Sequence, residues 1–485
     1  MASSLYAATA SMRYNDGVNR LIARSWSSCA VAAAITVASY GGVWFGVFHF
    51  DDFHSILENP HLESWRTFVG HLDHMVRPVL YVTLLFDRLA YGTSAAGYHA
   101  LNLLLHLGSG CLIYRILSRP VTEEAPHVAF WTTLLFLVHP IQTETVTYIS
   151  GRASGLMAFF YFLALCLYIE ATTPRHSGVG GRWYLVGAQA AFVLALGSKE
   201  TAATLPAALL LWDVLVRRFN VRQLRATFLS RHLPFWLILC AACGWAWWHP
   251  RYAALARFSL ELRAFWDNAL SQLHAGIYSL WLLLVPSQQT FDHDLPLLRT
   301  WSEWPVPVDL AVFVGMMAAT CLTVRRLPLV SFGCVWYWLQ LSPIMIIPRN
   351  DLLSERNLYL ASFGILLAGI VLFSRVLSAV SGASSSPALV RAAAGGAAVS
   401  VALALCLATV QRNALYRDPL LLWSDAVNKA PQKARPHNNL GHTYAERGDW
   451  EQAIEQFRLA AQLDPEYWVA QDNLRDAYLH HVGRR

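Results

Sequence analysis

Charged residues are scarce in this sequence of 485 residues, where Asp, Glu, Lys and Arg together make up 14%. A typical soluble domain contains about 25%. Apolar residues make up 55% of the chain, and the mean hydropathy is +0.36. These values exclude a soluble enzyme and a disordered chain, and they indicate a polytopic membrane protein.

Signatures of disulfides, metal sites and nucleic-acid binding are lacking as well. The eight cysteines all lie in apolar runs, and the C-x-x-C pair Cys240 and Cys243 has no second pair at zinc spacing. The cysteines are therefore interpreted as small buried hydrophobic residues, without a disulfide framework. No basic stripe with interleaved aromatic residues lies in a water-soluble segment, which excludes nucleic acid as a partner. No cofactor is expected; a divalent metal bridging Asp51 or Asp52 is an alternative without support.

Apolar runs dominate the chain up to residue 410. A helix needs about 20 residues to cross a bilayer. Twelve runs meet or approach this length: 29–50, 98–117, 128–143, 154–171, 183–198, 201–216, 233–248, 269–286, 308–324, 327–347, 358–378 and 392–410. The sequence therefore predicts an all-α fold, with a polytopic membrane domain of about 11–12 spans over residues 1–410.

The arginines between the runs predict the orientation of the spans, because cytoplasmic loops are enriched in positive charge. Three arginines within residues 1–26 place the N-terminus in the cytoplasm. If residues 269–286 crossed the membrane, Arg325 and Arg326 would fall on the outer side. We therefore expect 269–286, or its amphipathic approach 257–268, to be re-entrant or interfacial. This gives eleven crossings and an extracytoplasmic C-terminus.

Three loops are predicted on the outer side of the membrane. The first, residues 51–97, opens with an acidic motif and contains a predicted interfacial helix over 77–92, where two charged residues interrupt an apolar run. The two smaller outer loops are 287–307 and 348–360.

The tail, residues 411–485, contains a repeat motif. Seven residues fall on the positions of a 34-residue tetratricopeptide period: Leu440, Gly441, Tyr444, Ala453, Phe457, Ala460 and Pro465. One full repeat is flanked by half a repeat on each side. Because about three stacked repeats are needed to bury a core, the tail is predicted to lean on the outer face of the membrane domain. Docking of a protein or peptide is favoured over a cap without a partner.

Asp51 and Asp52 follow directly on the first apolar run. Adjacent carboxylates in a partly desolvated place repel each other, so one of them can titrate high enough to act as a general base. Successive residues point in different directions, so we expect one of the two to face the reacting atom. The alternative is the N-cap of an interfacial helix.

Other polar side chains are predicted on the same side of the membrane. Cations there run against the usual charge bias, and they are Arg77, Arg152, Lys199 and Arg356. A phosphate-bearing ligand explains them, because Arg offers paired donors and Lys a compact charge. The alternative is local pairing, for example of Lys199 with Glu200 or of Glu355 with Arg356.

An ordered set of motifs resembles a known family. The motifs are FDD..SILENP, RP before an interfacial helix, YHALNLLLH, HPIQTETV..ISGRAS, GSKE...LP and SERNLYL, followed by the repeat tail. Together they are similar to the transmembrane-and-tetratricopeptide-repeat proteins, which are O-mannosyltransferase-like members of the GT-C glycosyltransferase superfamily. The resemblance covers nearly the whole chain.

The resemblance implies a GT-C-type multispan fold and the transfer of a sugar from a polyprenyl or dolichyl phosphate to a protein acceptor. In the matching motifs, Asp51 and Asp52 would supply the general base. The donor phosphate would be held by Arg152, Lys199, Arg356 and Arg77. The acceptor and these groups would be oriented by His139, Glu144, Glu200, Glu355 and Tyr359.

The function predicted from the sequence is thus an inverting glycosyltransferase acting on a Ser or Thr hydroxyl outside the cytoplasm. Its partners would be the lipid-linked sugar, membrane lipid and a protein acceptor docked by the tail. The short tail favours a bacterial inner membrane with a periplasmic active site, and an endoplasmic reticulum membrane with a luminal site is the alternative. A transporter or flippase of a lipid-linked sugar, which would need inverted repeats, and a membrane-anchored scaffold are the alternative functions.

Overall fold

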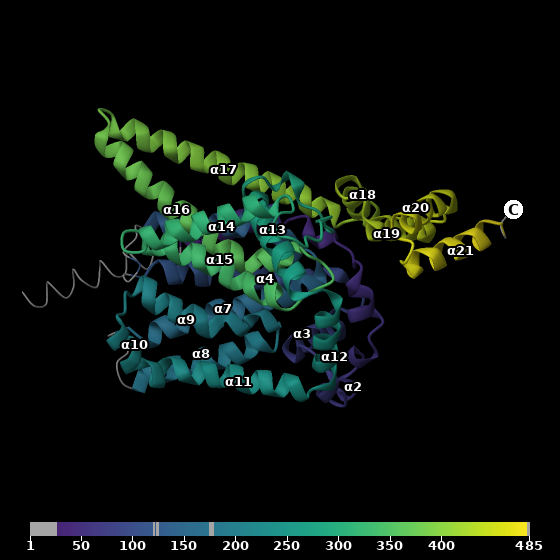
Figure 1. Cartoon of the computed structure of the whole chain (residues 1–485), viewed down its shortest axis with the longest axis horizontal. Coiled ribbons are helices and arrows are strands. Elements are labelled where there is room, and N and C mark those ends of the chain that lie inside the picture. Colours follow the sequence, from purple (N-terminus) through teal and green to yellow (C-terminus); the bar gives the residue numbers. More distant parts are fainter. Residues whose placement is uncertain (1–26, 120–121, 123–125, 174–178, 483–485) are drawn as a thin grey trace, which may run out of the picture.

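The computed structural model describes residues 27–119, 122, 126–173 and 179–482, and these residues form helices and loops without strands (Figure 1). The all-α prediction is therefore confirmed for this part of the chain. The arginines that precede the first apolar run lie outside the described residues. The cytoplasmic position of the N-terminus stays a prediction.

Nine helical segments among the described residues are long and apolar enough to cross a membrane. The first is Ser27–Phe45, and a fused segment, Val221–Trp248, contains α10 (Val221–Thr227) and α11 (Leu233–Trp248). The others contain α4 (Ala95–Leu117), α7 (Arg152–Ala171), α8 (Val179–Leu196), α14 (Val306–Thr323), α15 (Pro328–Ile346), α16 (Leu358–Ala383) and α17 (Pro387–Leu415).

Two shorter segments also run from one end of the bundle to the other. In α5 (Pro126–Val138), His127 bonds to Ser374 in the second half of α16, whereas His139 lies where the next loop begins. The second segment joins a 3-10 helix (Glu200–Thr204), α9 (Leu205–Leu211) and a π-helix (Trp212–Val216).

The helix α13 (Phe265–Leu284), which follows α12 (Pro250–Leu262), begins and ends at the same end of the bundle. At its start, the Asn268 amide donates to the carbonyl oxygens of Ile344 and Met345, at the end of α15. Near its other end, the carbonyl oxygen of Leu283 bonds to His139. The loops after α15 and α5 meet, since Ser354 donates to Glu144 at 2.8 Å. This placement agrees with the expectation that residues 269–286 do not cross the membrane, which stays a prediction.

The core lies between α4, α5, α7, α8, α15 and α16. The backbones of α15 and α16 touch at two glycines: a Cβ atom at Gly333 would lie 2.2 Å from the carbonyl oxygen of Gly364, and one at Gly364 would lie 2.3 Å from that of Gly333. Trp336 packs beside them against Phe363, with ring centroids 5.4 Å apart. Small residues thus allow the close helix contact that is common in membranes.

We call the end of the bundle that carries the tail the tail-side face; α10 lies at the opposite end (Figure 1). The first outer loop folds there into short helices, including α2 (Trp65–Val69) and α3 (Pro78–Tyr91), the helix predicted over 77–92. The loops that follow α5, α8, α13 and α15 lie at the same face and contribute His139, Lys199, Gln289 and Ser354.

The tail consists of α18 (Pro419–Lys429), α19 (Ala434–Glu446), α20 (Trp450–Leu463) and α21 (Trp468–Val482). The helices α19 and α20 form the repeat hairpin, and Phe457 packs against Gly441 where a Cβ atom would lie 2.8 Å from its ring. Lys433 pairs with Asp292, in the loop that precedes α14. The tail therefore leans on the membrane domain, as the sequence predicts.

Candidate active site

Asp52 is buried at the tail-side face and joins two loops. Its carboxylate accepts hydrogen bonds from the amide of His49 at 2.9 Å, the amide of Ser150 at 2.8 Å and the Ser150 hydroxyl. The loop that carries Ser150 packs closely, because a Cβ atom at Gly151 would lie 2.2 Å from the carbonyl oxygen of Glu144. Burial raises the pKa of Asp52 to about 7, although these hydrogen bonds oppose the rise.

Asp51 faces the other way, into a small cavity that is partly open to solvent. Its side chain is 44% exposed, and its backbone amide donates to the Tyr148 hydroxyl at 3.1 Å. Of the two adjacent aspartates, Asp51 is thus the one that a substrate can reach. We call this space the acidic cavity; it is lined by Phe50, Asp51, Glu144, Tyr148, Phe291, Asp351, Ser354, Arg356, Trp423 and Arg435.

Arg356 lies beside Asp51 in the acidic cavity. Its Nη1 atom is 3.8 Å from the nearer carboxylate oxygen of Asp51, and its Nε atom is 3.6 Å from Glu144. The backbone amide of Arg356 donates to the other oxygen of Glu144 at 3.0 Å, and the guanidinium lies over the Tyr148 ring. A carboxylate, a ring and a backbone bond therefore fix the direction of this cation.

Arg356 also lines a second cavity, which we call the Lys199 cavity. Its other lining residues are Met157, Lys199, Thr201, Gln340, Ile344, Asn357 and Leu360. The ammonium group of Lys199 donates to two neutral groups, the Ser154 hydroxyl and the Asn357 side-chain carbonyl, each at 2.8 Å. Burial and the neighbouring charges of Arg77, Arg356 and Arg349 lower the pKa of Lys199 well below its usual range. This is a place where an added anion would be stabilised.

Arg77 and Glu200 form an ion pair with each other. Two hydrogen bonds of 2.9 Å join the guanidinium of Arg77 to the carboxylate of Glu200, and Arg349 approaches the same carboxylate at 3.6 Å. The pairing of Lys199 with Glu200 that the sequence left open as an alternative is replaced by this ion pair. Lys199 and Arg356 are thus the predicted cations that line cavities.

Arg152 does not join this group. Its side chain is fully buried, 2.6 Å from Asp87, and it donates to Asn102 and to the carbonyl oxygen of Tyr98. It therefore holds α7 against α3 and α4, and it lines neither cavity. Because Asp87 lies in an apolar stretch of the sequence, its ion pair with Arg152 could not be recognised there.

Three other predicted residues lie beneath the cavities. His139 bonds to the carbonyl oxygen of Leu283, and Tyr359 bonds to His106 at 2.8 Å in the core. Glu355 is fully buried; its partner at 3.0 Å is His293, and not Arg356 as the sequence alternative had it. None of the three lines the acidic cavity; His139 and Glu355 bond to the segments around it, and Tyr359 bonds within the core.

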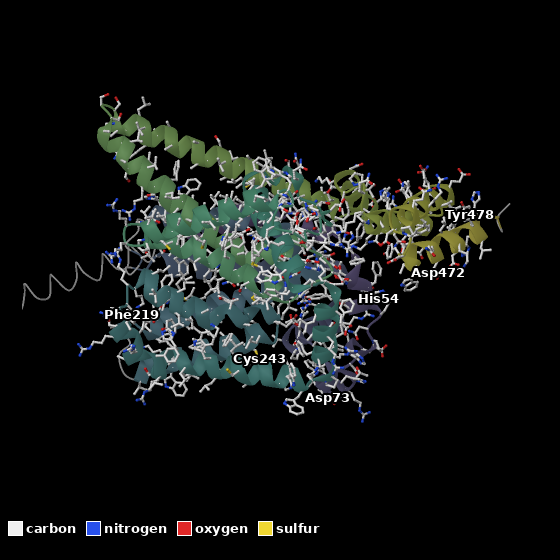
Figure 2. All side chains as sticks on the ribbon, in the orientation of Figure 1. His54, Asp73, Phe219, Cys243, Asp472 and Tyr478 are labelled. Atoms are coloured by element: carbon white, nitrogen blue, oxygen red, sulfur yellow. The ribbon has the colours of Figure 1, made fainter. Side chains whose placement is uncertain are left out.

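Several residues of the acidic cavity were missed by the sequence analysis. Those in the outer loops carried a signal, because they lie within or next to the motifs: Phe50, Tyr148, Asp351 and Ser354. Trp423 and Arg435 come from the tail, and nothing in the repeat pattern indicates that they reach Asp51. In Figure 2, oxygen and nitrogen atoms are concentrated at the end of the bundle near His54, whereas carbon dominates between the two ends.

Within the described part of the chain, no group of three or more His, Cys, Asp or Glu residues could hold a metal ion. The charged residues that line the two cavities are Asp51, Glu144, Asp351, Arg356, Arg435 and Lys199.

Fold and site together define an integral membrane protein with a polar cavity between its membrane domain and a helical repeat tail. The tetratricopeptide repeat model matches residues 434–467. Over 90% of its length, the chain is 24% identical to a protein O-mannosyl-transferase of Caenorhabditis elegans. It is 26% identical over 87% to protein O-mannosyl-transferase TMTC4 of Homo sapiens, and 26% identical over 89% to protein O-mannosyl-transferase Tmtc3 of Drosophila melanogaster.

The resemblance inferred from the motifs is thereby confirmed: the chain is homologous to proteins named TMTC O-mannosyl-transferases over most of its length. It spans 63%, 64% and 54% of the lengths of these three relatives. No solved structure matches the chain.

Proposed function

We propose that the protein is a glycosyltransferase that moves a sugar from a polyprenyl-phosphate donor to a Ser or Thr hydroxyl of a protein acceptor. The names of the relatives support a protein acceptor and mannose as the sugar. The observation that carries the proposal is the separation of 3.8 Å between Asp51 and Arg356 in one cavity. A transfer of this kind needs both groups near the anomeric carbon, a base for the acceptor hydroxyl and a cation for the leaving phosphate.

The donor would occupy the Lys199 cavity. This cavity combines the apolar side chains of Met157, Ile344 and Leu360 with two cations, Lys199 and Arg356. A lipid phosphate has the matching character, since its chain is apolar and its headgroup is anionic. Because Arg356 also lines the acidic cavity, the sugar would point from the phosphate toward Asp51.

The reaction would be a single displacement. The carboxylate of Asp51 takes the proton of the acceptor hydroxyl, and the hydroxyl oxygen attacks the anomeric carbon. The bond from that carbon to the phosphate oxygen breaks, and the phosphate keeps the electron pair. Arg356 stabilises the charge that develops on the phosphate, and the attack from the opposite face inverts the anomeric centre.

The tail-side face would lie outside the cytoplasm. Exposed arginines at the opposite end, such as Arg222 and Arg325, support this orientation through the charge bias of cytoplasmic loops. The tail-side face would meet the periplasm in a bacterial inner membrane, or the lumen in the endoplasmic reticulum. The tail would dock the acceptor, since it borders the acidic cavity.

The test uses the full chain in lipid nanodiscs with a mannosyl-phosphopolyprenol and a Ser/Thr-containing peptide. The expected result is a peptide that gains one hexose with inverted anomeric configuration, detected by mass spectrometry and NMR. Movement of the donor across a liposome membrane without any transfer to peptide would overturn the proposal in favour of a transporter.

A further inference from the structure

The backbone of Phe50, the residue before the proposed base, is strained. Its φ angle is 43°, in the left-handed region that residues with a side chain rarely adopt. Such a conformation persists where the surrounding structure enforces it, frequently at functional sites. The direction of Asp51 therefore depends on whatever holds Phe50 in place.

Two side chains of the tail contact the ring of Phe50. The Trp423 ring of α18 meets it edge to face at 5.9 Å, and the guanidinium carbon of Arg435 lies over it at 5.9 Å. Trp423 is 4% exposed and also packs against Phe291 at 5.3 Å. The ring of Phe50 is thus held from the tail and not from its own loop alone.

Arg435 is itself anchored on the membrane domain. It makes two hydrogen bonds of 2.6 Å to Asp292 and one of 2.7 Å to Asp351. Lys433 also donates to Asp292, and Lys429 donates to the carbonyl oxygen of Gln289. These charge-assisted bonds fix the tail at the rim of the acidic cavity.

We infer that Trp423 and Arg435 are positioning residues, which hold Phe50 in its left-handed conformation and thereby aim Asp51 into the acidic cavity. The role of Asp51 in this inference rests on the proposed function. The start of the tail is then part of the active site and not a separate docking module. Without these contacts, Phe50 relaxes to an ordinary φ angle and the Asp51 carboxylate turns away from Arg356.

The first experiment measures hydrogen exchange in the full chain in nanodiscs, and it needs no activity. Trp423→Ala is compared with Trp468→Ala, a matched control because Trp468 is 71% exposed. The amides of Asp52 and Phe53, which bond to the carbonyl oxygens of His49 and Phe50, are expected to exchange about three- to tenfold faster in Trp423→Ala. Equal exchange in Trp423→Ala and the wild type overturns the inference.

Trp423 also packs within the tail against Ala426 and Leu440, so a second pair of variants leaves the tail intact. Phe50→Ala and Phe50→Gly both remove the ring, but glycine adopts a positive φ angle without strain. Phe50→Gly is therefore expected to transfer sugar about two- to fivefold faster than Phe50→Ala, through kcat and not through the KM of the acceptor. A rate for Phe50→Ala that equals or exceeds that of Phe50→Gly contradicts the inference.

The two experiments separate the inference from the proposed function. If the wild type transfers no sugar, the proposed function fails, and the exchange of the Asp52 and Phe53 amides still decides whether the tail holds Phe50. If transfer occurs and exchange does not respond to Trp423→Ala, the positioning role alone is refuted.

Discussion

Arg77 and Glu200, which lie 123 positions apart in the sequence, form a bidentate ion pair with both hydrogen bonds at 2.9 Å. The pair ties the start of α3 to the 3-10 helix that follows α8. Burial would raise the pKa of Glu200, but the charge and hydrogen bonds of Arg77, together with the charge of Arg349, outweigh it and lower the pKa to about 2. Arg77 is thus occupied by a structural partner.

We predict that Arg77→Ala and Glu200→Gln each destabilise the protein and that their effects are not additive. The coupling is expected to be about 1 kcal/mol, because the pair is bidentate but partly exposed and therefore screened. A double-mutant cycle in detergent, at low and high salt, measures it. The KM for the lipid donor is expected to change little; a large rise in Arg77→Ala would show that Arg77 contacts the donor.

The second prediction distinguishes the two adjacent aspartates. Asp51→Asn is expected to lower the transfer rate about 10²–10⁴-fold and to change the stability by less than about 0.5 kcal/mol. Asp52→Asn is expected to cost roughly 1–3 kcal/mol, because it disturbs buried hydrogen bonds to His49 and Ser150. Glu58→Gln, an exposed carboxylate of the same loop, is the control. Wild-type activity in Asp51→Asn would remove the assigned base.

The third prediction concerns pH and Asp52. The pKa of Asp52 is about 7 in the folded chain, raised from an ordinary value of 3.8, so between these values the folded chain keeps a proton that the unfolded chain has lost. The stabilisation of the folded chain by this bound proton is therefore fully present below about pH 4 and falls as the pH rises to about 7. The stability of the wild type relative to Asp52→Asn is expected to decrease by roughly 2–3 kcal/mol from about pH 5 to about pH 8. If the difference in unfolding temperature between the wild type and Asp52→Asn stayed constant or grew with rising pH, the prediction would be wrong.

The fourth prediction tests the contact of α15 with α16. Gly333→Ala and Gly364→Ala would force a methyl group onto a backbone carbonyl oxygen, and each is expected to destabilise the protein by about 1–3 kcal/mol. Gly369→Ala is the matched control on α16, because nothing lies within 4 Å of a Cβ atom there. Equal unfolding temperatures for all three variants would show that this contact does not contribute to stability.

Much of the fold could be predicted from the sequence, because apolar length and repeat spacing are local properties. The runs that contain α4, α7 and α16 were long enough to be identified without any neighbour. The placement of α13 needed one non-local argument, the side on which Arg325 and Arg326 fall. The helix α5 has 13 residues, so length alone does not identify every segment that runs through the bundle.

The candidate site was predictable in location but not in geometry. Asp51 and Asp52 look alike in the sequence, and the choice between them is made by Ser150, 98 positions away. Arg152 resembles Arg356 in the same way, but the buried partner Asp87 removes it from the cavities. Trp423 could not be found, because the repeat spacing describes packing inside the tail and says nothing of the register between the tail and the membrane domain.

The last prediction compares the two cations of the Lys199 cavity. Arg356→Gln is expected to lower kcat/KM about 10²–10³-fold, because the charge of the leaving phosphate loses its stabilising partner. Arg356→Lys is expected to retain part of the activity, since it keeps the charge but loses the planar fork that contacts both Asp51 and Glu144. Lys199→Met is expected to raise the KM for the donor more than it lowers kcat, because in the proposed arrangement Lys199 would bind the phosphate, and it does not line the acidic cavity.

Arg325→Gln is the control for these variants, because Arg325 is exposed at the opposite end of the bundle. Steady-state rates with varied mannosyl-phosphopolyprenol separate kcat from KM. If Arg356→Gln and Arg325→Gln gave the same rates, the phosphate would have to leave elsewhere, and the assignment of the Lys199 cavity to the donor would be wrong. A loss in Arg356→Gln that is confined to the KM of the acceptor peptide would instead place Arg356 on the acceptor side, since a cation that meets the leaving group acts on the transition state and must change kcat.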